Sequence, residues 1–473
     1  MKKLFAVAFT LLLLALMITP VSAQGPTSYS STVTVTNITE ETGVITLSFV
    51  NPDGTTESEV LTESIGPLET KFFSSFPISS GFKGAMFISS SVPVASTSDI
   101  MGKNSSGATM NYASFVGVSA GSTKVFLPLL MDSNYGFNTY FSIQNTSGSN
   151  VDVSIEYSDG TVVADILNLQ PNAAVVVDNQ EENHTAKKFS AILNATGDIA
   201  VTVVEWADGS NGKQLFAFNG FSENQGTTNP VISMVNQNNY GYWTSIPIQN
   251  LGSVDSVVTL TYKPTKAGTE CSETLTIPAG GLAEFGAFAH VFTPQTPGTN
   301  CVRGQKFVGA AVVTGNSENV PLIGLMNQST TLRGNYEKAG ALMSINPALA
   351  TSEIVFPEAY QWFGGSSWWS SITIVNMSGG TLAAGDISCR GIGTANSNPV
   401  DISWSNPSDL VNGSGWITDL YDDWGPLPNG FLGGIICTSA SSGEIIGTLN
   451  NLGHTASATL DSYTLYEGIN VSP

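Results

Sequence analysis

Charged residues are scarce in this chain, and the basic ones are scarcer than the acidic ones. Only 11% of the 473 residues carry charge, with 16 Lys and Arg against 37 Asp and Glu. So acidic a balance excludes a surface that attracts phosphate backbones or anionic lipid. Hydrophobic residues nevertheless make up 41% of the chain, whereas disordered chains show the opposite balance. We therefore predict a folded protein with a mainly neutral polar surface and no nucleic-acid partner.

The one long apolar run is at the start of the sequence, from Leu4 to Ile18. It follows two lysines and precedes Pro20 and the small residues 21–23, a pattern typical of a secretory signal peptide cleaved after Ala23. The run is too short for a stable membrane span, and no cysteine follows it to take a lipid. We predict a signal peptide at 1–23 and a secreted mature chain of charge 14 − 37 = −23, extracellular or on the cell surface, without an integral membrane segment.

A repeat organises the rest of the chain. Four alternating apolar strands each end in an asparagine followed by a turn, in "VTVTNITEETG", "FSIQNTSGS", "IPIQNLGS" and "ITIVNMSGG", and the landmark residues are Asn37, Asn145, Asn250 and Asn376. A second period-two strand follows each of them, and alternation of this kind indicates strands with one buried face. The asparagine itself has a structural explanation, since its side chain can bond its own backbone where the strand turns.

A second landmark recurs later in each copy, where a phenylalanine opens a strand of small residues: Phe82, Phe189, Phe307 and Phe431. Short strands separated by Gly, Pro, Asn and Asp turns predict an all-β chain of four tandem immunoglobulin-like β-sandwich domains after the signal peptide. We place repeat 1 at 24–121, repeat 2 at 122–226, repeat 3, with insertions, at 227–350, and repeat 4 at 351–473. Four such domains in a row predict a rod or a curved string.

Two stretches of the repeat contain recognisable sequence motifs, "SFVGVSAGSTKVFLPLLMDSNYGFNTYFSIQN" at 114–145 and "PLPNGFLGGIICTS" at 426–439. They resemble the tandem β-sandwich repeats of secreted and surface-layer-like proteins from filamentous Chloroflexota bacteria. The second repeat resembles them most, the third resembles them well apart from insertions, the fourth keeps the outline, and the first lacks the opening strand. The resemblance implies an extracellular location and a structural or adhesive role, and it supplies no active site.

Four cysteines in a secreted chain are expected to pair. Cys389 and Cys437 occupy positions of the fourth repeat that face the core in the other copies, so we predict a Cys389–Cys437 bridge between opposite sheets, as in immunoglobulin domains. Cys271 and Cys301 lie in the insertions of the third repeat, where a disulfide would cross-link the inserted residues and reduce their loop entropy. Neither pair has the spacing of a metal site.

Catalytic motifs are weak. "GVSAG" at 117–121 fits the GxSxG pattern, but a strand-like segment follows it where a nucleophile elbow needs a helix, so Ser119 reads as part of a linker. The histidines His184, His290 and His454 lie in three different repeats and share no motif, which argues against a Ser-His-Asp site. We predict no enzyme activity and no cofactor.

Two acidic loops stand in corresponding places before the phenylalanine strand, "DNQEENH" at 178–184 and "DLYDDWG" at 419–425. Grouped carboxylates of this kind can bind calcium, although neither loop has regular ligand spacing. A solvated acidic loop is the favoured interpretation, and calcium binding remains the alternative.

Aromatic residues cluster before the landmark strand in the last three repeats. The clusters are Tyr135, Phe137 and Tyr140; Tyr240, Tyr242 and Trp243; and Trp362, Phe363, Trp368 and Trp369. Recurrence at each domain entrance favours packing between neighbouring domains, while flat rings on a neutral surface would also suit sugar binding. The fourth cluster is the richest in tryptophan, so we name Trp362, Trp368 and Trp369 as candidate glycan-binding residues.

The first repeat lacks the apolar strand that opens the other three, "VFLPLL", "PVISMV" and "IVFPEAY". A sandwich without that strand exposes a sheet edge, which another chain can pair with unless its own residues blunt it. One donor for this edge is the C-terminal "TLYEGINVSP" of a neighbouring copy, which would give a head-to-tail polymer. We predict a self-assembling structural subunit of a surface layer, sheath or filament, whose partner is the chain itself. The alternative is an adhesin that binds cell-surface polysaccharide.

Overall fold

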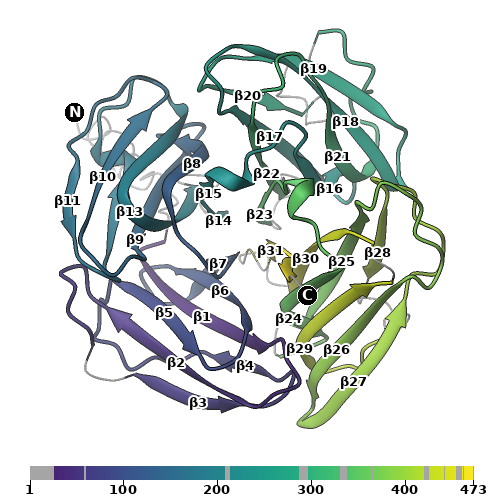
Figure 1. Cartoon of the computed structure of the whole chain (residues 1–473), viewed down its shortest axis with the longest axis horizontal. Helices are drawn as coiled ribbons and strands as arrows, with labels where there is room; N and C mark the ends of the chain where they lie inside the picture. Colours follow the sequence, from purple (N-terminus) through teal and green to yellow (C-terminus); the bar gives the residue numbers. More distant parts are fainter. Residues whose placement is uncertain are drawn as a thin grey trace, which may run out of the picture.

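Four β-sandwiches are arranged around a common centre in the computed structural model (Figure 1). The structure describes residues 26–57, 60–207, 214–286, 297–330, 338–364, 367–419, 426–440, 443–453, 461 and 463–471. The predicted signal peptide lies outside this range. The prediction of an all-β chain of tandem sandwiches is confirmed, and within the described residues only three short 3₁₀ helices interrupt the strands and loops.

The first sandwich has a sheet with the order β4-β1-β6-β7 and a second with the order β3-β2-β5. Its strands are β1 (Ser28–Asn37), β2 (Gly43–Val50), β3 (Leu61–Ile65), β4 (Thr70–Phe73), β5 (Ala85–Ser90), β6 (Val94–Lys103) and β7 (Thr109–Val116).

In the second sandwich the long strand β13 runs through both sheets. Its first half pairs with β8 and β10, and its second half pairs with β9 and β14. The elements are β8 (Ser122–Met131), β9 (Phe137–Asn145), β10 (Val151–Tyr157), β11 (Ile166–Leu169), β12 (Ala174–Asp178), η1 (Asn179–Glu181), β13 (Lys188–Ala207), β14 (Leu215–Asn219), β15 (Phe221–Ser222) and η3 (Glu223–Gln225).

The third sandwich contains sheets with the orders β16-β21-β18-β19 and β20-β17-β22-β23. Its elements are β16 (Val231–Gln237), β17 (Tyr242–Asn250), β18 (Ser256–Ala267), β19 (Cys271–Ile277), β20 (Leu282–Phe285), β21 (Phe307–Asn316), β22 (Leu322–Thr330), β23 (Ala339–Met343) and η4 (Pro347–Leu349).

The fourth sandwich contains sheets with the orders β27-β26-β29-β24-β32 and β28-β25-β30-β31. Its strands are β24 (Glu353–Gln361), β25 (Trp368–Asn376), β26 (Ile387–Ala395), β27 (Asn398–Ser405), β28 (Gly415–Asp419), β29 (Phe431–Ser439), β30 (Ile445–Gly453), β31 (Tyr463–Glu467) and β32 (Ile469–Val471).

The alternating strands form the cores, as their sequences predict. In β10 the residues Val153, Ile155 and Tyr157 are buried while the residues between them face outward. This period of two follows from the pleat of a strand that has one covered face. Comparable residues of each sandwich meet in its interior.

The landmark asparagines hold the end of the strand and the turn that follows. All four side chains are fully buried, and each makes the same three bonds. In the second sandwich the Asn145 amide nitrogen donates to the carbonyl oxygens of Ser149 and Leu169, both at 2.8 Å, and its oxygen accepts from the Ser147 backbone N–H at 2.8 Å. Asn37, Asn250 and Asn376 bond equivalent groups. The repeated asparagine is therefore a turn brace.

Two disulfides join the four cysteines, Cys271 to Cys301 and Cys389 to Cys437. The predicted location of the second between opposite sheets is wrong. Cys389 on β26 and Cys437 on β29 are direct partners in neighbouring antiparallel strands of one sheet, with their Cα atoms 4.0 Å apart. Both side chains point into the core, as predicted, and the error concerns only which strands are neighbours.

The predicted rod or string is also wrong, because the four sandwiches close on one another. One strand of each sandwich lies near the centre, where β7 packs on β14, β14 on β23, β23 on β31, and β31 on β7 (Figure 1). These strands do not alternate: β14 and β23 are buried along their whole length. A strand that is apolar on both faces can pack one face against the core of its own sandwich and the other face against the adjacent sandwich.

The described part of the chain contains no helix with the length and apolarity that a membrane crossing needs.

Candidate functional site

The aromatic clusters predicted from the sequence lie largely in the contacts between sandwiches. The Tyr140 ring meets Tyr29 of the first sandwich with centroids 5.9 Å apart, and Tyr242 meets Tyr463 of the fourth at 5.8 Å. Trp368 meets Tyr112 of the first sandwich edge-on at 5.2 Å. These three contacts support the interdomain-packing interpretation. Trp362 and Trp369, like Trp368, are partly buried.

Among the residues that the structure describes, the most exposed aromatic side chains are instead two tyrosines of the second and third sandwiches. Tyr135 is 89% exposed and Tyr240 is 92% exposed. Each is followed by a glycine, and the pair forms the tip of the hairpin that leads into the landmark strand. The φ angles are 53° at Tyr135 and 50° at Tyr240, and each following glycine has a φ of 87°.

Two successive positive φ angles define a type I′ turn, whose first central position favours Asn, Asp or Gly. A tyrosine there is strained and gains no burial from its position. The sequence favoured the fourth cluster because it is the richest in tryptophan. The dipeptide Tyr-Gly between two apolar strands was the signal that would have identified these turns.

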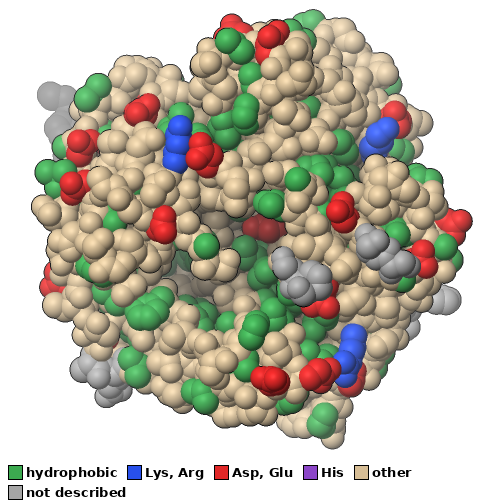
Figure 2. Space-filling model, viewed as in Figure 1, with side chains coloured by type: hydrophobic (Ala, Val, Ile, Leu, Met, Phe, Trp, Pro, Cys, Tyr) green, Lys and Arg blue, Asp and Glu red, His purple; other side chains and the backbone are tan. Residues whose placement is uncertain are grey.

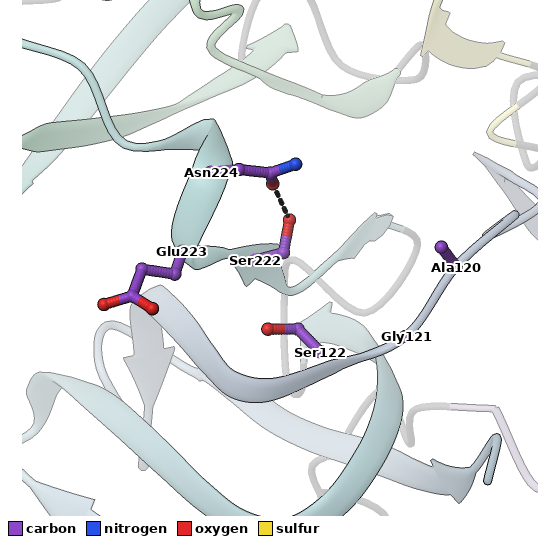
Figure 3. Close-up of a pocket in the computed structure, with 6 residues that line it drawn as sticks. All are labelled: Ala120, Gly121, Ser122, Ser222, Glu223 and Asn224. Atoms are coloured by element: carbon purple, nitrogen blue, oxygen red, sulfur yellow. Dashed lines mark hydrogen bonds between the residues drawn. The ribbon is translucent and has the colours of Figure 1, made fainter.

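The four sandwiches together form a closed ring of domains. The face of this domain ring shown in Figure 2 is mostly neutral, with scattered acidic side chains, few basic ones, and a hollow at the centre. A pocket of about 420 Å³ near the ring axis is lined by parts of the three linkers between sandwiches and by residues 467–470. A smaller adjoining pocket of about 380 Å³ lies between the first linker and η3 (Figure 3). Its polar side chains are Ser122, Ser222, Glu223 and Asn224, and the Ser222 hydroxyl bonds to Asn224 at 2.6 Å.

The "GVSAG" motif lies in the first linker, between β7 and β8, and contributes Ser119 to the larger pocket. Both neighbouring elements are strands, so the strand-to-helix turn of a nucleophile elbow is absent. Its second glycine, Gly121, has a packing explanation, because a Cβ at this position would lie 2.1 Å from the Thr146 hydroxyl. The motif is therefore a linker closely packed on the second sandwich.

His184 has local partners in the second sandwich and no serine among them. Its Nδ1 lies 3.3 Å from Asp159 and its Nε2 lies 3.0 Å from Glu182, and its ring stacks on Phe189. His290 and His454 lie outside the described residues. The described part of the chain thus places no histidine beside Ser119.

The first acidic loop is organised by its own backbone. Asp178 caps η1 by accepting from the Gln180 N–H at 3.1 Å, and Glu182 faces His184. Residues 420–425 of the second loop lie outside the described residues. Within the described ranges, no three His, Cys, Asp or Glu side chains are grouped to hold a metal ion. Calcium binding stays the alternative to the predicted solvated loop.

The first sandwich has an unpaired sheet edge at β5. In the other three sandwiches the equivalent strand pairs on this side with an opening strand, namely β8, β16 or β24. Among the described residues β5 pairs only with β2, and Ser89 and Ser90 at its end are exposed. The missing strand inferred from the sequence therefore corresponds to a sheet edge that has no partner strand among the described residues and is exposed at Ser89 and Ser90, while Phe87 packs on the second sandwich.

The C-terminal segment does not serve as a free donor for that edge. β31 pairs with β30, and β32 pairs with β24, all within the fourth sandwich. The C-terminal-donor hypothesis is therefore wrong, because both strands are already part of their own domain.

Buried acids lie in the contacts between sandwiches, and the sequence analysis missed them. The Asn327 side-chain amide of the third sandwich donates to Glu205 of the second at 2.7 Å. Burial raises the pKa of Glu205 to about 8 and the pKa of Asp99 in the first sandwich to about 6. An acid inside an apolar strand, as in "VTVVEWA", was the available signal. Such residues are buried only when a partner lies opposite.

No protein-family model matches the chain, and no curated protein matches it. Two solved structures align weakly. One is the crystal structure of a tetra-tandem repeat in the extending region of a large adhesion protein, with 11% identity over 95% of this chain and 96% of that chain and a TM-score of 0.11. The other is the BSP domain of a biofilm associated protein, with 7% identity, coverage of 94% and 90%, and a TM-score of 0.13. TM-scores this low do not establish a structural relationship to either protein. The resemblance to the Chloroflexota repeats therefore stays a prediction.

Proposed function

We propose that the chain is a non-enzymatic structural protein of the cell exterior, a subunit that assembles with further copies of itself into a layer, sheath or filament. Its two disulfides fit an oxidising compartment. The observation that carries the proposal is the open edge at β5, which stands where the other three sandwiches hold a strand.

An open edge offers hydrogen bonds to any extended segment that reaches it. The Ser91 N–H bonds the Val44 carbonyl of β2 at 3.0 Å, so by the alternation of an antiparallel ladder the Ser90 N–H points away from β2. Ser90 is exposed, and its side chain contributes little to the core. The backbone donor at this residue is therefore open to pairing with a second copy.

Ser90→Pro removes this outward donor and leaves the bonds to β2 in place. We expect the purified wild-type chain to form ordered fibres or sheets in negative-stain electron microscopy, and we expect Ser90→Pro to remain as single rings. Ser90→Ala is the matched control, because it also loses the serine hydroxyl but keeps the N–H. Equal assembly of the proline and alanine variants would show that β5 does not mediate assembly. An absence of assembly in the wild type would reject the proposed function.

A second candidate function is adhesion to cell-surface polysaccharide, and the exposed tyrosines favour it. Tyr135 and Tyr240 present flat rings on strained turns, and strain of this kind is concentrated at functional sites. A ring on a neutral surface can stack on a sugar face. The proposed contact residues thus change from Trp362, Trp368 and Trp369 to the two tyrosines.

The double variant Tyr135→Asn and Tyr240→Asn tests this candidate without a risk of unfolding. Asn-Gly is the favoured dipeptide of a type I′ turn, so we expect each substitution to stabilise the chain by roughly 1 kcal/mol in thermal denaturation. If the rings contact sugar, binding to a glycan array or to insoluble polysaccharide should fall by about tenfold or more. Unchanged binding would exclude the tyrosines, and Trp369→Ala serves as a comparison at the earlier candidate site.

A further inference from the structure

Three of the four contacts between sandwiches are spanned by a linker, and one is not. The contact between the fourth and first sandwiches, which we call the closure seam, joins β24 and β31 to β1, β6 and β7. The two sandwiches are the first and last in the described chain, so they meet only through non-covalent contacts.

The closure seam is nevertheless a specific interface. The Thr36 hydroxyl donates to the Pro357 carbonyl at 3.0 Å, and the Asp461 N–H donates to the Met110 carbonyl at 2.8 Å. Tyr112 packs on Trp368, and Val116 of β7 contacts the core of the fourth sandwich. If the seam opened, these complementary faces would be exposed at opposite ends of one chain.

A pair of buried carboxyl groups lies across the closure seam. Asp99 on β6 comes within hydrogen-bonding reach of Glu358 on β24. Ser114 donates to Asp99, and Tyr360 donates to Glu358. The other ionisable groups that act on the pair are the tyrosines Tyr112 on β7 and Tyr466 on β31. Two carboxylates cannot both ionise at this separation without strong repulsion, so the closed seam favours a shared proton.

We propose that the closure seam opens and re-forms between copies, so that the face of the first sandwich in one molecule binds the face of the fourth sandwich in the next. This inference rests on the proposed structural function, and it names a second copy of the chain as the partner of both faces. The interface is heterologous, and heterologous contacts that do not close generate filaments. In dilute protein the two faces of one chain meet first, which favours the closed ring.

The shared proton supplies a way to open the seam experimentally. Burial raises the pKa of both carboxyl groups, so raising the pH ionises the pair and weakens the seam. Exposure to about pH 9 followed by return to about pH 5 at high protein concentration should then allow exchange between molecules. The same cycle in dilute protein should return single rings.

A pair of cysteines can lock the seam. A Cβ added at Gly434 of the fourth sandwich would lie 3.1 Å from the Thr36 hydroxyl oxygen, close to the spacing between a Cβ and the far sulfur of a disulfide. The Thr70 hydroxyl, 2.9 Å from that Cβ, has to rotate. Thr36→Cys with Gly434→Cys therefore closes the ring covalently when oxidised.

The chain offers a matched control at a seam that already has a linker. A Cβ at Gly415 of the fourth sandwich would lie 3.1 Å from the Thr265 hydroxyl oxygen of the third. Thr265→Cys with Gly415→Cys introduces the same kinds of substitution but leaves the closure seam free. Reduction of either variant provides a second control within the same protein.

After the pH cycle, and with Ser90→Pro added to every chain to exclude assembly through β5, size-exclusion chromatography and electron microscopy should find head-to-tail oligomers of the otherwise wild-type chain, of the Thr265–Gly415 variant and of both reduced variants. The oxidised Thr36–Gly434 variant should give about tenfold less assembled protein. Glu358→Gln should also suppress exchange after the cycle, because a neutral amide at this site cannot ionise. Assembly of the oxidised locked variant at the wild-type level would overturn seam exchange and leave the proposed function standing. Failure of every variant and of the wild type to assemble under any condition would overturn both.

Discussion

Asn145→Asp is expected to destabilise the second sandwich by about 3 to 5 kcal/mol at neutral pH. The substitution keeps the shape of the side chain but removes both N–H donors. A buried carboxylate would then face the carbonyl oxygens of Ser149 and Leu169, each now 2.8 Å from the former amide nitrogen. Unsatisfied buried carbonyl groups and an unpaired buried charge are both costly. Urea denaturation of the full chain, followed by the near-ultraviolet signal, measures the loss.

Asn150→Asp is the matched control for that experiment. Asn150 lies in the same turn region and is exposed, so the same change of charge there should alter the free energy of unfolding by less than about 0.5 kcal/mol. Acidification should restore part of the stability of Asn145→Asp, because a protonated carboxyl group regains one donor. Equal denaturation midpoints for the two variants would contradict the role of the asparagine as a turn brace.

Glu205→Gln is expected to stabilise the chain at alkaline pH and to flatten the dependence of its stability on pH. The pKa of Glu205 rises from its usual value of 4.5 to about 8 in the folded chain because the carboxyl group is buried. Between these values the folded state holds a proton that the unfolded state has lost, so stability falls as the pH rises. The full effect is roughly 5 kcal/mol between acidic and alkaline solution.

The difference between wild type and Glu205→Gln isolates this group from the other buried acids. The glutamine can still accept the bond from Asn327, so the contact between the second and third sandwiches is kept. Glu156→Gln, at an exposed position of β10, is the matched control for the substitution itself. A parallel loss of stability in wild type and Glu205→Gln from about pH 5 to about pH 9 would show that Glu205 does not ionise in this range.

The elements within each sandwich could be predicted because their physical causes are local. Strands with one covered face alternate, as β10 does, and two of the three bonds made by the asparagine that closes each landmark strand join it to groups two and four residues away. The facing of Cys389 and Cys437 followed from the same period. Which strands become neighbours depends on the whole sheet order, so their location in one sheet could not be read from the period.

The closed arrangement of the sandwiches was less evident from the sequence than the strands within each sandwich. β14 and β23, "LFAFN" and "AGALM", are apolar on both faces, whereas a strand at the edge of an isolated sandwich would alternate. The identity of the element that covers the second face is a long-range property of all four repeats. The acids Asp99, Glu205 and Glu358 were equally hard to place, because each is matched by a residue of another sandwich.

The closure of the four sandwiches also fixes how the number of repeats can change. An open solenoid can gain or lose a unit at little cost, because each unit contacts only its sequence neighbours. Here β31 packs on β7, so every copy has two neighbours and none is terminal. Deleting one copy would leave two incompatible faces, and adding one would break the contacts at the axis. A change in the number of repeats would therefore disturb the contacts among β7, β14, β23 and β31, whereas loop insertions such as those of the third copy leave these contacts in place.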